Sequence, residues 1–175
     1  MATFTTEQLT RAVDLLVEDL RERAVPVRIQ IVGGAAIALR YDDRRVSTRD
    51  VDVLGAQPED VVVASVERLA DQHGWPRDWL NTKVRMFQPD PDHPEPAWVV
   101  IREVDSVVVE VGTPQLLLAM KLYAARGRRD FDDIAVLIEA CGVTTVQEAE
   151  ALFEAHYSAE LLKPKALALL SELLR

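Results

Sequence analysis

The chain has 175 residues, of which 49% are apolar, so it can form one domain, or one domain with a small appendage, around an ample core. Its net charge of −9 argues against a broad nucleic-acid-binding face, because phosphate contacts dominate the affinity of such faces. No apolar run reaches the roughly 20 residues of a membrane span, and a single cysteine excludes an internal disulfide, so we expect a cytoplasmic protein that does not engage a membrane.

The first elements in chain order are an amphipathic helix over residues 5–23 and an apolar strand over residues 27–32. Gly33 and Gly34 follow this strand and precede a short helix of small residues over 35–39. Adjacent glycines after a strand let the backbone approach a ligand closely, and the N–H groups that open the next helix form an anion site. Gly33 and Gly34 are therefore candidate phosphate-binding residues.

A second strand carries Asp50 and Asp52 after an arginine-rich loop that includes Arg49. Alternate residues of a strand share one face, so we expect the two Cα atoms about 6.5 Å apart on the same side. Two like charges at that separation repel by about 2.5 kcal/mol at an effective dielectric constant near 20. A hard divalent cation between them would relieve this repulsion. The alternative is a surface strand whose carboxylates are solvated.

The middle of the chain predicts a helix over residues 61–73, a strand over 81–87, and a mobile proline-rich loop over 88–97. A hairpin of β-branched residues follows over 97–103 and 106–111, with its turn at Val104 and Asp105. Its second strand places one acid, Glu110, among valines.

The last third predicts helices only. The helix that begins at Thr113 and Pro114 contains Lys121, which either extends to solvent or reaches into a site. In the next helix Asp130 and Asp133 lie three residues apart and share a face. We expect an α+β fold with a small mixed β-sheet core and flanking helices over 1–112. A helical C-terminal portion over 113–175 is predicted to pack on that core as part of one structural domain.

The chain resembles the nucleotidyltransferase superfamily (polymerase-beta-like) in two places. The first is Val32-Gly33-Gly34 followed by Asp50-Val51-Asp52, although the gap between these motifs is longer than usual. The second is the set Lys121, Arg129, Asp130 and Asp133, which is similar to a lysine and a basic–Asp–x–x–Asp run in AbiEii-type toxins of toxin–antitoxin systems. The resemblance covers about residues 27–138.

This resemblance implies transfer of a nucleoside monophosphate from a nucleoside triphosphate to an acceptor hydroxyl, on tRNA or on a protein, with Mg²⁺ or Mn²⁺ as cofactor. It also implies a toxin–antitoxin component with a cognate antitoxin or toxin as partner. A third metal-binding carboxylate is expected from a later strand; Glu110 is the candidate, Asp105 is the weaker one, and an edge-strand glutamate facing water is the alternative. The implied catalytic residues are Asp50, Asp52, Glu110, Lys121, Asp130 and Asp133, and the implied nucleotide-binding residues are Gly33, Gly34, Arg49, Lys121 and Arg129.

Three other hypotheses stay open. A catalytically inactive member of the fold would bind nucleotide or a partner without turnover, as an antitoxin-like protein. A Rossmann dinucleotide binder would need Gly-x-Gly-x-x-Gly where this chain has Gly-Gly-Ala-Ala, and it leaves the acidic pair unexplained. A purely structural interaction domain is the third.

Overall fold

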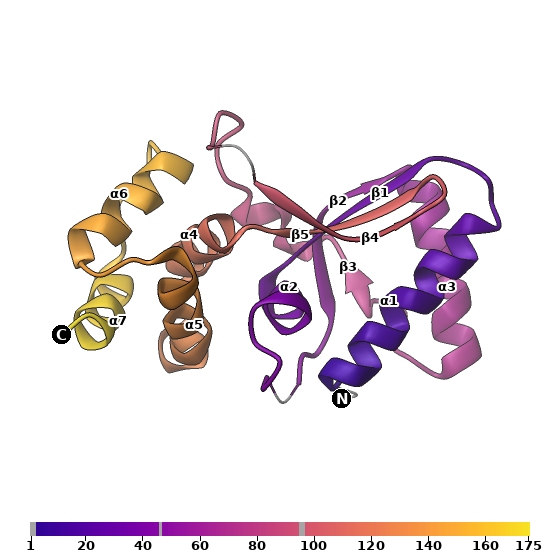
Figure 1. Cartoon of the computed structure of the whole chain (residues 1–175), viewed down its shortest axis with the longest axis horizontal. Helices are drawn as coiled ribbons and strands as arrows, with labels where there is room; N and C mark the ends of the chain where they lie inside the picture. The colour runs from indigo at the N-terminus through magenta and orange to yellow at the C-terminus, as the bar shows by residue number, and fades with distance from the viewer. Residues whose placement is uncertain (1–2, 46, 95–96) are drawn as a thin grey trace. The chain divides into compact units, whose positions relative to one another are not determined.

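The computed structural model describes residues 3–45, 47–94 and 97–175, which form seven α-helices and one five-stranded mixed sheet (Figure 1). The predicted α+β class is confirmed. Within these described ranges no helix is long and apolar enough to cross a bilayer. The chain divides into two compact units, Met1–Arg85 with Trp98–Val111, and Met86–Ala97 with Gly112–Arg175. The packing of the C-terminal helices on the core stays a prediction.

The sheet of the first unit has the strand order β3-β2-β1-β5-β4. Strand β1 runs antiparallel to β2 and parallel to β5, and β2 runs parallel to β3. The predicted hairpin is present as β4 and β5, with a turn between them. The strand bounds are β1 Val27–Val32, β2 Val51–Gln57, β3 Leu80–Asn81, β4 Trp98–Val104 and β5 Val107–Gly112.

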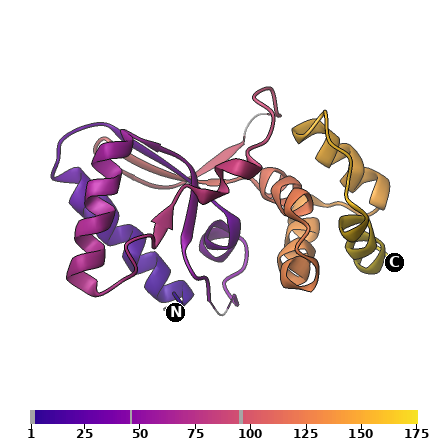
Figure 2. The same cartoon turned by 180° about the vertical axis from the view of Figure 1, so that it is seen from behind.

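Helices α1 (Thr6–Arg21), α2 (Gly33–Arg40) and α3 (Glu59–His73) cover one face of this sheet (Figures 1 and 2). Alternate β1 residues Ile29 and Ile31 are buried against that side at 0% and 1% exposure. Asp52 pairs in register with Val32, the residue after Ile31, so it lies on the opposite face of the sheet.

The N-terminal segment holds the loop that leads to the acidic pair. Phe4 forms an antiparallel bridge with Thr48, through backbone hydrogen bonds of 2.7 and 2.9 Å. The Thr6 hydroxyl donates to the Arg45 carbonyl at 2.9 Å, and the Thr48 hydroxyl donates to the Asp50 carbonyl at 3.1 Å. The bonds from Phe4 and Thr6 reach Thr48 and Arg45, so the loop before β2 is held by contacts distant in sequence.

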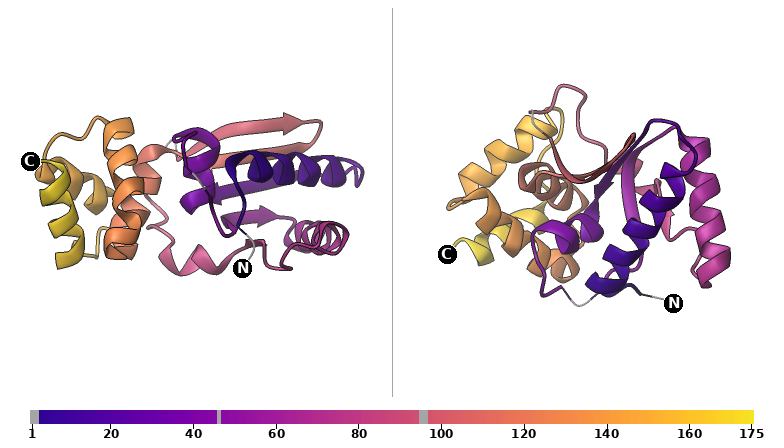
Figure 3. Two further views of the ribbon diagram at one scale, coloured as in Figure 1. Left: turned by 90° about the horizontal axis from the view of Figure 1, so that it is seen from below. Right: turned by 45° about the vertical axis from the view of Figure 1, so that its right-hand side comes forward.

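In the second unit the regular elements of the described residues are helical, apart from the last residue of β5, and α4 packs on both α5 and α6 (Figure 3). Thr113 caps α4 by accepting from the Leu116 N–H at 3.4 Å, and Pro114 occupies the first turn, as predicted. The aromatic rings of Tyr123, Phe153 and Tyr157 stack between α4 and the end of α6. The element bounds are α4 Pro114–Ala124, the 3₁₀ helix η2 Gly127–Asp130, α5 Phe131–Cys141, α6 Val146–His156 and α7 Pro164–Leu173.

The predicted strand over 81–87 is wrong. Strand β3 ends at Asn81, and a 3₁₀ helix, η1, follows over Lys83–Phe87. The side-chain Oδ1 of Asn81 accepts the Lys83 N–H at 3.0 Å, and Arg85 N–H donates to the Thr82 carbonyl at 3.0 Å. An asparagine that bonds to its own backbone two residues ahead favours a turn over a strand.

The proline-rich segment forms no regular element over 88–94, as predicted, but side-chain bonds hold it to the end of α6. The Asp90 carboxylate accepts from the Ser158 N–H at 2.7 Å and from its hydroxyl at 2.6 Å. The His93 ring stacks on His156, with centroids 5.8 Å apart. These contacts do not fit the predicted mobility of residues 88–94, and residues 95 and 96 lie outside the described residues.

Candidate functional site

The structure brings Asp52 to the glycine turn. Gly33 has φ +66°, and a Cβ atom placed on it would lie 3.0 Å from Asp52 Oδ2. Two constraints therefore act on position 33. A side chain would be strained by the left-handed backbone conformation, and it would press on the carboxylate.

Gly34 is needed for a different reason. A Cβ atom on Gly34 would lie 2.8 Å from Nη2 of Arg45 and 3.3 Å from the Thr48 hydroxyl oxygen. The guanidinium of Arg45 thus lies on the glycine turn, while the predicted Arg49 is exposed. The sequence offers three arginines in this loop, and no local signal distinguishes Arg45 from the others.

Asp50 lies directly before β2 and is held by Asn81. The Asn81 side-chain Nδ2 donates to Asp50 Oδ2 at 3.1 Å and to the Asp78 carbonyl at 3.3 Å. Asn81 is 9% exposed and pairs in register with Asp52 across β2 and β3. Asn81 was not a candidate from the sequence, because this residue was predicted to lie in a longer strand.

Lys83 brings a positive charge close to the acidic pair. Its Nζ donates to the Asp78 carboxylate, and both side chains are largely exposed. The hydrogen bond from Lys83 to Asp78 and the Asp78 charge raise the pKa of Lys83, and the charges of Asp50 and Asp52 raise it further. The backbone N–H of Lys83 is also bonded to the Asn81 side chain that holds Asp50.

Glu110 is placed away from this pair. It pairs in register with Gln30, and its carboxylate accepts from the Arg28 guanidinium and from Gln30 Nε2, the latter at 3.3 Å. Two strand spacings and two residues of offset put its Cα roughly 12 Å from that of Asp52. Across the described residues, no three side chains of His, Cys, Asp or Glu converge as a metal site.

The two alternatives for the third carboxylate also disagree with the structure. Strand β5 lies inside the sheet and Glu110 is 6% exposed, so the reading of an edge glutamate facing water is wrong. Asp105 lies in the hairpin turn before β5, at the opposite end of the strands from Gly33, and it pairs with Arg21 at 3.5 Å. Neither acid is brought to the Asp50–Asp52 pair.

In the second unit, Lys121 forms a buried cluster with two carboxylates. Its Nζ lies 2.9 Å from Asp130 Oδ1 and 2.6 Å from Asp133 Oδ2. All three residues are at most 6% exposed. Of the two readings left open for Lys121, extension to solvent is therefore wrong.

Arg126 completes this cluster. Its backbone N–H donates to Asp130 Oδ2 at 3.0 Å, and its guanidinium donates to both carboxylate oxygens, at 3.1 and 3.2 Å. Burial pushes the pKa of Asp130 upward, but the Lys121 charge and the hydrogen bonds from Arg126 and Lys121 outweigh it, so this pKa lies below its ordinary value. The arginine that orients Asp130 is thus Arg126, whereas Arg129 is exposed.

The residues at the glycine turn fit a hard divalent cation. Mg²⁺ is usually held by one or two carboxylates, and waters and substrate phosphates complete its shell. Asp50 and Asp52 supply the carboxylates, and Asp52 lies against the turn whose N–H groups open α2. The bond from Asn81 to Asp50 is the kind of outer-shell contact that orients a metal ligand. Mn²⁺ takes the same oxygen ligands.

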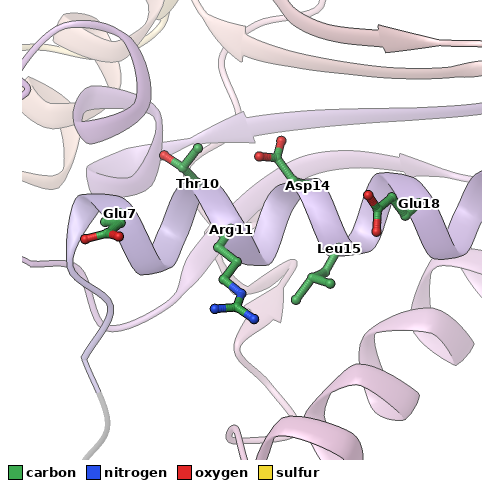
Figure 4. A pocket seen from close by; sticks show the side chains of 6 residues that line it. All are labelled: Glu7, Thr10, Arg11, Asp14, Leu15 and Glu18. Atoms are coloured by element: carbon green, nitrogen blue, oxygen red, sulfur yellow. The ribbon is translucent and has the colours of Figure 1, made fainter.

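An open hollow of about 490 Å³ lies along α1, and none of the predicted residues lines it (Figure 4). One of its acids, Asp14, binds the Arg102 guanidinium at 2.7 Å. This ion pair joins the helix to the edge strand β4. Its lining residues are Glu7, Thr10, Arg11, Asp14, Leu15 and Glu18.

Comparisons of this chain with models of protein families, with curated proteins and with solved structures find no match.

Proposed function

We propose that this protein is a metal-dependent nucleotidyltransferase that moves a nucleoside monophosphate from a nucleoside triphosphate to an acceptor hydroxyl. The observation that carries the proposal is the contact of Asp52 with the Gly33 turn, with Asp50 two residues away. An acidic pair beside the N–H groups that open a helix combines a cation site with an anion site. A nucleoside triphosphate with its divalent cation is a ligand that needs both.

Each residue of this site has a defined task in that reaction. Asp50 and Asp52 would hold Mg²⁺ or Mn²⁺, and the cation would polarise the α-phosphate and neutralise the leaving pyrophosphate. Gly33 lets the phosphates approach the N–H groups that open α2. Arg45, packed on Gly34, adds positive charge beside the same turn.

The reaction is an in-line displacement at the α-phosphorus. The acceptor oxygen forms a new bond to that phosphorus, the bond to the oxygen that bridges the α- and β-phosphates breaks, and pyrophosphate leaves with the electron pair. The acceptor proton passes to water. Catalysis of this kind depends mostly on positioning and on electrostatic stabilisation of the phosphates.

Two predicted catalytic residues, Glu110 and Lys121, form ion pairs outside the glycine-turn site. The charge of Glu110 is countered by Arg28, and the charge of Lys121 is countered by Asp130 and Asp133. The proposal for the glycine-turn site does not require either residue. Catalytic roles for Glu110, Lys121, Asp130 and Asp133, and nucleotide contacts of Arg49 and Arg129, stay predictions from the resemblance.

A labelling experiment tests the proposal. The protein is incubated with Mg²⁺ and one of the four nucleoside triphosphates, labelled with ³²P at either the α- or the γ-position, together with total tRNA or a protein extract. Label from the α-position should enter a macromolecule, and label from the γ-position should not. Asp52→Asn should abolish this transfer because it removes a ligand charge, whereas Asp71→Asn, an exposed aspartate paired with Arg77, should not.

Two results would overturn the proposal. One is full transfer by Asp52→Asn in the presence of Mg²⁺, and the other is transfer of the γ-label in place of the α-label. Calorimetry with ATP and Mg²⁺ then separates binding from chemistry. Binding without transfer would indicate the inactive, antitoxin-like alternative.

A further inference from the structure

Strand β3 and the turn after it contribute two further residues next to the acidic pair, Asn81 and Lys83. Asn81 uses three polar contacts there: Nδ2 donates to Asp50 Oδ2 and to the Asp78 carbonyl, and Oδ1 accepts the Lys83 N–H. The Asn81 side chain thus connects Asp50 to the turn that carries Lys83. An amide at 9% exposure with both ends bonded has little freedom to move.

The position of Asp50 explains why such a tie matters. Asp50 precedes the first residue of β2, so ladder hydrogen bonds of the strand do not fix its side chain. The bond from Asn81 to its carboxylate is charge-assisted, a class about twice as strong as neutral hydrogen bonds. This bond uses Oδ2 and leaves Oδ1 for a cation.

Lys83 is positioned by the same asparagine. Its ion pair with Asp78 joins side chains that are 66% and 62% exposed, and exposed pairs of this kind contribute little free energy. The lysine can therefore exchange Asp78 for a stronger anion. Its backbone N–H is bonded to the same Asn81 side chain that holds Asp50, so the lysine projects from a backbone position next to the acidic pair.

We propose that Asn81 is a positioning residue that holds Asp50 for the divalent cation, and that Lys83 binds the polyphosphate of the nucleotide. The inference rests on the proposed function and names two residues of the same site. It separates their tasks: Asn81 acts on the cation through Asp50, and Lys83 acts on the nucleotide directly.

The wild-type protein offers a direct test, because Asn81 is the sole asparagine of the sequence. Selective ¹⁵N-asparagine labelling gives one pair of side-chain amide signals. Substoichiometric Mn²⁺ should broaden this pair, and Mg²⁺ should shift it, in the wild type but not in Asp52→Ala, a variant that adds no second asparagine. Binding of Mn²⁺ that leaves the signals unchanged would overturn the placement of Asn81 at the cation.

Affinities of the variants test the two tasks. Asn81→Ala should weaken Mn²⁺ binding, titrated by electron paramagnetic resonance without nucleotide, by about tenfold or more, as outer-shell losses do. The neighbouring Thr82→Ala should leave it unchanged. Lys83→Met should leave Mn²⁺ affinity unchanged and weaken ATP binding in the presence of Mg²⁺ by about tenfold, and Lys83→Arg should retain it.

The outcomes distinguish this inference from the proposed function. If wild type binds neither Mn²⁺ nor ATP, both fail. If wild type binds both and Asp52→Asn does not, while Asn81→Ala binds Mn²⁺ as tightly as wild type, only the positioning role fails. If Lys83→Met binds ATP as wild type does, the polyphosphate contact fails. Should Asn81→Ala not fold, the isotope measurement on the wild type still decides the placement.

Discussion

Alanine at position 33 should damage the site more than the fold, and Gly74 provides the matched comparison. Both glycines belong to the first unit and have nearly the same left-handed backbone, with φ +66° at Gly33 and +67° at Gly74. A Cβ on Gly33 would lie 3.0 Å from Asp52 Oδ2, whereas a Cβ on Gly74 would meet no described atom within 4 Å. The pair therefore separates backbone strain from pressure on the carboxylate.

The expected magnitudes follow from this geometry. Each alanine variant should lose about 1–2 kcal/mol of unfolding free energy from the left-handed conformation. For a chain of this size each kcal/mol lowers the melting temperature by about 2–4 °C. Only Gly33→Ala should also move Asp52, by roughly 0.5 Å, to restore an ordinary contact distance. Displacements of this order at a reacting centre lower activity severely, so we expect at least a tenfold loss.

Two assays on each variant check this reasoning. Thermal unfolding followed by circular dichroism should give similar losses for Gly33→Ala and Gly74→Ala. Mn²⁺ affinity and α-label transfer should fall in Gly33→Ala alone. Equal Mn²⁺ affinity in both variants would refute the claim that position 33 is kept as glycine for the sake of Asp52.

Two further predictions concern the second unit. Lys121→Met leaves Asp130 and Asp133 buried without their lysine, so it should cost about 3–5 kcal/mol. This loss should appear in circular dichroism but less in tryptophan fluorescence, because all three tryptophans lie in the first unit. Equal stability of Lys121→Met and the exposed control Lys165→Met would contradict this prediction. Burial lowers the pKa of His156 below its ordinary 6.5, so the folded state disfavours its protonation. The stability that His156 contributes is therefore present above pH 6.5 and is lost as the pH falls below it. Urea unfolding at pH 7.5 and 5.5 should show this loss, and it should be smaller in His156→Phe; the same pH dependence in the variant would exclude His156 as its source.

Local patterns along the chain were sufficient for the strand, the glycine turn and the acidic pair. A run of apolar residues ending in two glycines specifies β1 and the start of α2 without reference to other segments. The capping signal at Thr113 was equally local, and the structure shows it. Local propensity and turn chemistry act over a few residues, so a sequence displays them directly.

Contacts between residues distant in sequence determined which side chains meet at each site. Asn81 lies 31 residues from Asp50, and Arg28 lies 82 residues from the Glu110 that it neutralises. Strand alternation predicts the face on which a residue lies, but it does not specify which strands become neighbours. Sheet order is set by how the apolar faces pack together, and the fold of the loop before β2 places Arg45 at the turn. Arg126, by contrast, bonds Asp130 from only four residues away. The sequence alone thus determined the chemistry available at the turn, and only the tertiary structure decided which charges meet, because their partners are brought together by the packing of the core.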